Sequence, residues 1–174
     1  MRQLIRQREI VVDEWREAGD GDVVPSAQTA QGNAAAAAPS LIIPIARWRT
    51  EREQWHASAL RLGVRVDPAD RIETLEPDLG RLSLIAIEFT GPSEGRGYTQ
   101  ARVLRDRYRF TGELRAVGYV KRDQLLFMAR CGFDAFELSE GVDAREALAA
   151  FDDFTVAYQP ASERRSPLRR RVGG

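Results

Sequence analysis

Apolar residues along the chain follow two patterns that alternate from residue 41 to residue 158: short continuous runs, and longer stretches with apolar positions three or four residues apart. The clearest run is LSLIAIEF, residues 82–89, and a continuously apolar run of this length is typical of a strand buried on both faces of a parallel sheet. Other strands are predicted at REIVVDEW (8–15), LIIPI (41–45), VRV (64–66), GELRAVGYV (112–120) and FDAFEL (133–138).

Helices are predicted between these strands. Gly63 is the expected C-cap of the first helix, and Asp67 is the expected N-cap of the second, with proline at its first position. Pro44 indicates that the strand before the first helix lies at an edge or ends there. The helices are predicted at residues 47–61, 67–79, 98–109, 121–132 and 143–154.

Alternating strands and helices favour one parallel sheet, because parallel neighbours are joined by crossover helices of fixed hand. About five such units are too few for a closed eight-stranded barrel. The sequence therefore predicts a single α/β domain with an open, mainly parallel sheet of repeated β-α units. A partial TIM-barrel-like arrangement is the alternative.

The domain organisation follows from where these patterns stop. Residues 1–18 are predicted to be an N-terminal strand segment, and residues 41–158 the α/β domain. Residues 19–40 include an alanine run and few large apolar side chains, so a flexible linker is expected there. Residues 159–174 are predicted to form a disordered basic tail.

Charge and hydropathy exclude some partners. The chain has 26 basic and 26 acidic residues and a net charge of zero, whereas a general nucleic-acid binder carries a basic excess. The N-terminal sequence MRQLIRQREIVVDEW lacks the apolar core of a signal peptide, and no run approaches the length of a membrane span. The expected location is the cytoplasm, with neither nucleic acid nor membrane as a partner.

The chain has one cysteine, Cys131, and one histidine, His56. No disulfide can form within the chain, and no zinc or iron–sulfur site can be assembled, because such sites need about four of these ligands. His56 has no nucleophile or acidic partner in a recognisable motif. We therefore expect no metal and no cofactor, and the catalytic residues, like the question of whether the protein is an enzyme, stay unassigned.

A ligand site is predicted where LSLIAIEF ends, since open α/β sheets bind ligands beyond the carboxyl ends of their strands. Backbone N–H groups at the following helix attract anions, and the guanidinium fork of Arg96 suits phosphate, sulfate or carboxylate. A second loop, GYVKRDQL, follows the next strand and should lie nearby. The predicted anion-binding residues are Gly95, Arg96, Gly97, Tyr98, Thr99, Arg122 and Asp123.

A structural role for the same residues stays open. Arg96 can instead be a surface residue paired with Glu94 or Glu88, and Asp123 can interact within the N-terminus of its own helix. The loop GPSEGRG is neither a phosphate-binding loop with Gly-Lys-Ser/Thr nor a dinucleotide fingerprint.

Four segments carry a family resemblance: GRGYTQARVLR, GELRAVG, RDQL and RCGFDAFEL. With IVVDEW, IIPIARW and DDFTVAYQ they make residues 1–159 resemble the bacterial domain-of-unknown-function 934 family. Its members are commonly encoded beside assimilatory sulfite reductase in proteobacteria, and they often carry the label of an oxidoreductase involved in sulfite reduction. The chain departs from the family pattern at Glu94 and at Tyr119, where the family usually has aspartate.

Three hypotheses about function follow from the resemblance and from the predicted loops. The resemblance implies an accessory protein of assimilatory sulfate and sulfite reduction that acts with sulfite reductase. The loop geometry favours an enzyme or sensor that binds a small oxyanion or a phosphorylated ligand. The third hypothesis is a non-catalytic docking scaffold. Six-electron reduction of sulfite needs redox centres, and the sequence has no recognisable motif for one, so reduction by this chain alone is not expected.

Overall fold

The computed structural model describes residues 3–19, 40–58 and 60–151, and within them eight strands form one sheet in the order β2-β1-β8-β7-β6-β5-β4-β3. Neighbours from β3 to β8 are parallel, and β1 and β2 are antiparallel. The strands are β1 (Leu4–Arg6), β2 (Glu9–Val11), β3 (Trp15–Glu17), β4 (Ser40–Pro44), β5 (Arg61–Val66), β6 (Leu82–Phe89), β7 (Glu113–Gly118) and β8 (Ala135–Glu137).

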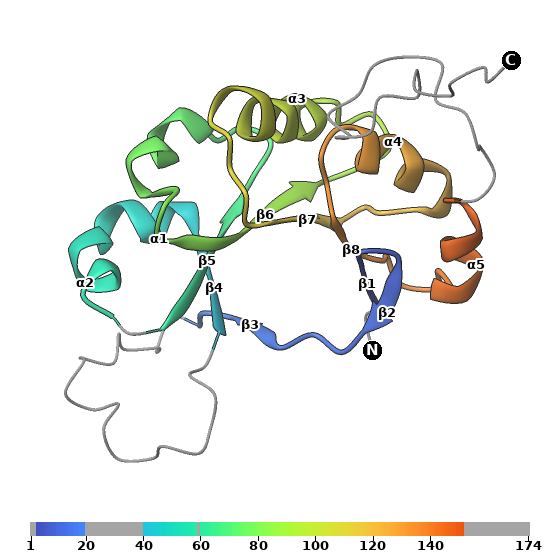
Figure 1. The fold of residues 1–174 in the computed structure, drawn as a ribbon, viewed down its shortest axis with the longest axis horizontal. Coiled ribbons are helices and arrows are strands. Elements are labelled where there is room, and N and C mark those ends of the chain that lie inside the picture. Colours follow the sequence, from blue (N-terminus) through green and yellow to red (C-terminus); the bar gives the residue numbers. More distant parts are fainter. Residues whose placement is uncertain (1–2, 20–39, 59, 152–174) are drawn as a thin grey trace, which may run out of the picture.

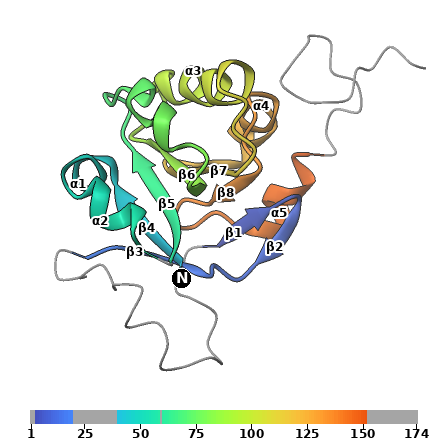
Figure 2. The same ribbon diagram turned by 60° about the vertical axis from the view of Figure 1, so that its left-hand side comes forward.

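The sheet curls strongly into a half-barrel, with the helices outside it (Figures 1 and 2). Both views show α3 and α4 side by side above β6, β7 and β8. The prediction of a single α/β domain with an open, mainly parallel sheet is confirmed, and the curvature agrees with the partial-barrel alternative. The helices are α1 (Ile45–Thr50), α2 (Arg52–His56), α3 (Arg96–Arg102), α4 (Leu125–Arg130) and α5 (Ala144–Ala149), with 3-10 helices η2 (Ile72–Asp78) and η4 (Arg122–Gln124) and a π-helical turn η3 (Val103–Arg107).

Strand pleating separates two layers of buried side chains. Alternate residues such as Ile43, Val64, Ile85 and Leu114 face the helices and form the main core. The opposite, concave face has a smaller apolar cluster of Trp15, Ile42, Leu84, Ala86 and Val117. Both faces of the central strands are therefore buried, as the continuously apolar sequence of β6 predicts.

The N-terminal segment differs from the single strand predicted at residues 8–15. It forms a β1–β2 hairpin whose turn residues, Gln7 and Arg8, have φ angles of 51° and 67°. A turn with two positive φ angles matches the twist of a hairpin, although asparagine and glycine are the usual residues there. The chain then crosses to the other edge of the sheet, where β3 pairs with β4.

Several helix boundaries also differ from the prediction. The helix predicted at residues 47–61 is instead two short helices, α1 and α2, of which the second ends at His56, and Gly63, the predicted C-cap, lies inside β5. The second predicted helix shortens to η2, because residues 67–70 form a turn in which Asp70 Oδ2 accepts from the Asp67 N–H at 3.0 Å. Pro44 ends β4 as expected.

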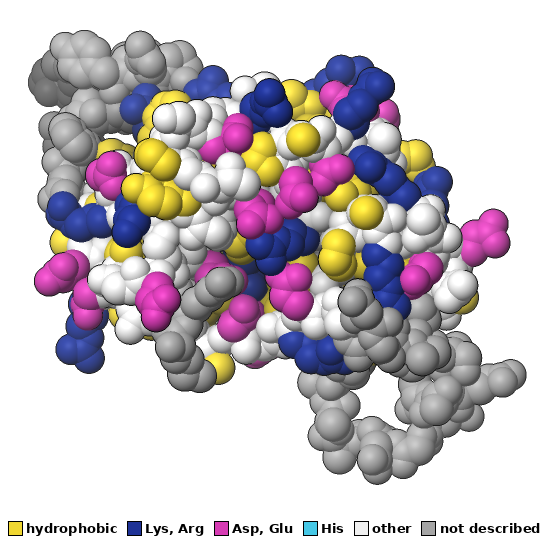
Figure 3. All heavy atoms as spheres, turned by 180° about the vertical axis from the view of Figure 1, so that it is seen from behind, with side chains coloured by type: hydrophobic (Ala, Val, Ile, Leu, Met, Phe, Trp, Pro, Cys, Tyr) yellow, Lys and Arg dark blue, Asp and Glu magenta, His cyan; other side chains and the backbone are white. Residues whose placement is uncertain are grey.

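Residues 20–39 of the predicted linker and the whole predicted tail, 159–174, lie outside the described residues, as do residues 152–158 at the end of the predicted domain. No helix among the described residues is both long enough and apolar enough to cross a membrane. Basic and acidic side chains are interleaved over the face seen in Figure 3, without a broad area of one charge.

A buried arginine ties the N-terminal segment to the concave face. Residues 12–14, the crossing segment, join β2 and β3 at opposite edges of the sheet and pass below it (Figure 1). Asp13 of this segment accepts a hydrogen bond from Arg115 Nη1 at 2.8 Å, and Glu113 Oε1 accepts from Arg115 Nε at the same distance. Arg115 is completely buried, so its charge depends on these carboxylates for compensation.

We expect Arg115→Ala to lower the free energy of unfolding by about 3–5 kcal/mol, because it leaves the Glu113 carboxylate buried without its main partner. Arg71→Gln is the control, since among the described residues the Arg71 side chain makes only an exposed 3.9 Å ion pair, with Glu73, and its loss should change stability by less than about 1 kcal/mol. Urea denaturation measures both variants. Equal stability of Arg115→Ala and the parent protein would refute a structural role for this charge.

Candidate functional site at the carboxyl ends of the strands

The carboxyl ends of β3, β5 and β6 bring a cluster of charged side chains together on the concave face. Arg65 Nη1 lies 2.8 Å from Glu17 Oε1. Its Nη2 lies 2.9 Å from Glu88 Oε1, and its Nε donates to Glu88 Oε2 at 3.1 Å. The guanidinium thus holds Glu88 with two parallel contacts, the geometry that fixes a carboxylate most firmly.

Strand register explains this meeting. Arg65 lies opposite Ala86 in the β5–β6 pair, and Glu88 is two residues further along on the same face. Glu17 lies opposite Ile42 in β4, which separates β3 from β5, so the long side chain of Arg65 reaches across one strand. Burial lowers the pKa of Arg65, but the hydrogen bond to Glu88 and the charge of Glu17 outweigh this effect, and the pKa is raised.

Asp67 adds a second carboxyl group to the cluster, just beyond the end of β5. A hydrogen bond with Glu88 raises the pKa of Asp67, and desolvation and the negative charges of Glu88 and Asp70 act in the same direction. A hydrogen bond between two carboxyl groups requires a proton on one of them. Asp67 and Glu88 thus have the arrangement in which two carboxyl groups can hold one proton between them, next to a fixed guanidinium.

The predicted loop after β6 lies at the same end of the sheet. Gly95 is the N-cap of α3, and Glu94 Oε1 accepts a hydrogen bond from the Arg96 N–H at 2.9 Å. Glu94 thus occupies one of the backbone donors that an anion would use. The side chains of Arg96 and Thr99 are exposed.

Gly97 has a packing role. A Cβ atom there would lie 2.7 Å from the ring of Phe89, far inside van der Waals contact. The glycine allows α3 to approach the end of β6 closely and sets the distance between the helix and the strand.

Tyr98 connects the two predicted loops. Its ring packs against Phe89 at 5.0 Å and Phe127 at 4.9 Å between centroids. Desolvation raises the pKa of Tyr98, the charges of Cys131 and Asp123 raise it further, and a hydrogen bond with Gln124 opposes them.

Asp123 and Arg122, from the second predicted loop, interact with different parts of the molecule. Asp123 is exposed and acts on Tyr98 through its charge. Arg122 Nε donates to the Glu146 carbonyl at 3.0 Å, so Arg122 is held toward α5. The structure thus places Tyr98 near Asp123, whereas Arg122 is tied to a different helix from Arg96.

Sequence reasoning missed the contributions of Glu17, Arg65 and Asp67. Asp67 had a different predicted role, as a helix N-cap, and Glu17 is far away in the sequence. The available signal was Arg65 itself, because a charged residue interrupts the apolar strand VRV next to its carboxyl end. Only the order of the strands shows that these residues meet.

His56 belongs to a separate cluster around buried Asp78. The Asp78 carboxylate accepts from Trp48 Nε1 at 2.8 Å and from Arg52 Nη2 at 2.6 Å, and His56 Nε2 lies 2.9 Å from it. These contacts fasten α1 and α2 to η2, near the amino end of β6. In the described parts of the chain, no group of histidine, cysteine and acidic side chains is arranged to hold a metal ion.

Residues 63–169 match the family of bacterial proteins of unknown function DUF934, and the chain belongs to this family. The match begins within β5, so it includes Arg65, Asp67 and Glu88. No curated protein matches the chain in sequence.

We expect Gly97→Ala to destabilise the protein by roughly 1–3 kcal/mol, because the methyl group forces Phe89 or α3 to move. Gly95→Ala is the matched control, since a Cβ at Gly95 meets nothing within 4 Å. Denaturant unfolding of both variants separates the cost of the steric contact at residue 97 from the effect on stability of replacing any glycine by alanine. Similar unfolding midpoints for the two variants would contradict the packing role.

The Asp67–Glu88 pair predicts a specific dependence of stability on pH. A raised folded-state pKa means that the folded protein binds the proton more tightly than the unfolded chain. This contribution is present below the ordinary pKa of 3.8 and is lost as pH rises through the raised value. Asp67→Asn should reduce this dependence of the unfolding free energy on pH. It should also raise the melting temperature at neutral pH, where the carboxylates of Asp67 and Glu88 otherwise repel each other. An NMR titration that gives Asp67 an ordinary pKa would refute the shared proton.

Proposed function

We propose that this protein is an accessory factor of assimilatory sulfate and sulfite reduction that acts with sulfite reductase, and that its working site is the cluster of Arg65, Asp67 and Glu88. The pathway is supported by resemblance to proteins commonly encoded beside that reductase. The site is supported by one observation: Arg65 holds Glu88 with two contacts at the carboxyl ends of parallel strands, beside Asp67, whose pKa is raised chiefly by a hydrogen bond with Glu88.

The carboxyl ends of the strands are where barrel-like α/β folds carry their chemistry, because the loops there can vary without disturbing the sheet. In this cluster Arg65 fixes the orientation of Glu88, and Asp67 exchanges the shared proton with Glu88 or with a ligand. Sulfite and bisulfite differ by one proton, so a site that donates and accepts a proton suits this substrate class. The proposed role is binding and proton transfer, while the reductase supplies the electrons.

Capture of an oxyanion or a phosphorylated ligand at the loop after β6 is the second candidate function. It is favoured by the exposed guanidinium of Arg96, which forms no ion pair with any acidic side chain that the structure describes. Gly95, Gly97, Tyr98 and Thr99 would surround the ligand, with Arg122 and Asp123 from the next loop. An incoming anion has to compete with Glu94 for the Arg96 N–H.

Gene deletion tests the pathway. We expect a deletion strain to grow more slowly than its parent on sulfate as sole sulfur source and equally well on cysteine, because cysteine bypasses sulfite reduction. A plasmid copy of the gene should restore growth on sulfate. Equal growth of deletion and parent strains on sulfate would refute the pathway.

Complementation with variants tests the site in the same strain. Asp67→Asn cannot exchange the proton but is expected to fold, so it should restore growth poorly. Glu76→Gln is the control, because Glu76 is exposed on η2, outside the cluster. Full restoration by Asp67→Asn would remove the acid–base pair from the proposed function and leave the pathway assignment intact.

A further inference from the structure

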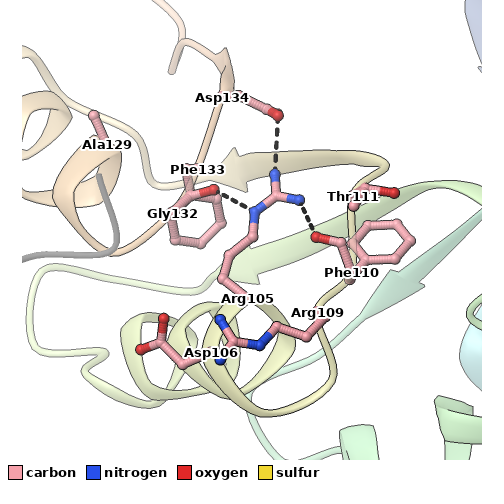
Figure 4. A pocket seen from close by; sticks show the side chains of 9 residues that line it. All are labelled: Arg105, Asp106, Arg109, Phe110, Thr111, Ala129, Gly132, Phe133 and Asp134. Atoms are coloured by element: carbon pink, nitrogen blue, oxygen red, sulfur yellow. Dashed lines mark hydrogen bonds and ion pairs between the residues drawn. The ribbon is translucent and has the colours of Figure 1, made fainter. Parts of the chain in front are cut away.

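A cavity of about 510 Å³ opens at the opposite end of the sheet, where β7 and β8 begin (Figure 4). Its walls come from the turn after η3 and from the segment between α4 and β8. Phe110 and Phe133, which are 5% and 4% exposed, line it together with Ala129 and Gly132. The charged and hydroxyl groups that face it are Arg105, Asp106, Arg109, Thr111 and Asp134.

Arg105 forms a rigid wall of this cavity. Its guanidinium donates to three backbone carbonyls, those of Gly132 at 2.9 Å, Phe110 at 2.6 Å and Gly112 at 2.8 Å. It also donates to Asp134 Oδ2 at 2.9 Å, and Asp134 Oδ1 accepts from the Leu114 N–H at 2.8 Å. Arg105 and Asp134 are therefore engaged in holding the starts of β7 and β8 together.

Arg109 differs from Arg105 in this respect. Its side chain is exposed, and its guanidinium makes no hydrogen bond or ion pair with residues 3–19, 40–58 or 60–151. Figure 4 accordingly draws no dashed line from Arg109 to the other lining residues. Arg109 lies in the left-handed region with φ of 54°, where glycine is favoured. The Phe110 N–H donates to the Leu104 carbonyl at 2.9 Å, which is the helix-ending pattern that normally places glycine at this position.

The backbone at residue 109 thus favours glycine, and yet an arginine occupies it and adds a cation to the lining of the cavity, on the side of Asp106 (Figure 4). Strained residues of this kind cluster at ligand sites, where the side chain has a use that compensates for the strain. We propose that this cavity binds a small carboxylate with an apolar body, and that Arg109 holds the carboxylate.

The lining determines the class of ligand. The planar guanidinium of Arg109 matches a carboxylate with two parallel hydrogen bonds, and the apolar part of the lining, from Phe110, Ala129 and Phe133, suits a hydrocarbon body. The exposed Asp106 and the Asp134 carboxylate add negative charge to the lining. A dianion such as sulfate is therefore less suitable than a monoanion. The cavity volume lies within the range of sites for small molecules.

Benzoate is the test ligand, and the neutral isostere benzamide is its control. We expect saturable NMR shift changes with benzoate in the amides of residues 109–111 and 132–134 of the full chain. Benzamide, sulfate and phosphate should give weaker changes there. Absence of saturable changes with benzoate, or stronger binding of sulfate or phosphate, would overturn the proposal.

Arg109→Gly provides a sharp variant, because glycine fits the positive φ while the cation is lost. It should weaken benzoate binding by about tenfold or more, as expected for the loss of a charge-assisted pair of hydrogen bonds, and leave the melting temperature equal or higher. Arg109→Lys should retain part of the affinity, because an ammonium lacks the planar fork. Arg145→Gln, an exposed change on α5, should bind like the parent. Unchanged benzoate affinity in Arg109→Gly would refute the role of Arg109.

Discussion

The buried guanidinium of Arg115 lies between carboxylates from two distant parts of the chain. Glu113 comes from the same strand, whereas Asp13 is 102 residues away in sequence. A buried charge is tolerated only when its partners are held in place, so this contact fixes where the crossing segment passes below the sheet. The positions of β3 and of Trp15, whose ring fills the concave face, follow from it.

The same geometry explains the candidate site. Because β3 is held at the edge of the sheet, Glu17 comes within reach of Arg65, and Arg65 in turn orients Glu88. The concave face thus combines the apolar side chains of Leu84, Ala86 and Val117 with two groups of ion pairs. One group surrounds the buried Arg115, and the other surrounds Arg65 toward the carboxyl ends of the strands. The side chains around Arg65 are partly exposed, so ligands and water have access to them, whereas those around Arg115 serve the fold.

Much of the fold is readable from the sequence because apolar periodicity depends on local burial. The run at 82–89 forms β6, and the later βα units appear in the predicted order. The N-terminal hairpin was missed because Gln7 and Arg8 are unusual residues for a turn with positive φ angles.

The candidate site is only partly readable for a related reason. Arg96, Gly97 and Tyr98 belong to one loop and one helix, so a local motif indicates their place at the end of β6. Arg65 and Glu17 come together only through the pairing of β3, β4 and β5, which periodicity does not reveal. Tertiary context therefore decides which charged residues meet.

The N-terminal residues provide both edges of the sheet, and this has a consequence for the order of folding. The β1 strand leaves the ribosome first but pairs with β8, and Gln3 Oε1 accepts a hydrogen bond from the Ala144 N–H, 141 residues later. Closing so long a loop is entropically costly and slow compared with local contacts. The β1 strand must therefore wait for β8, its final neighbour, until almost all of the described domain has been made.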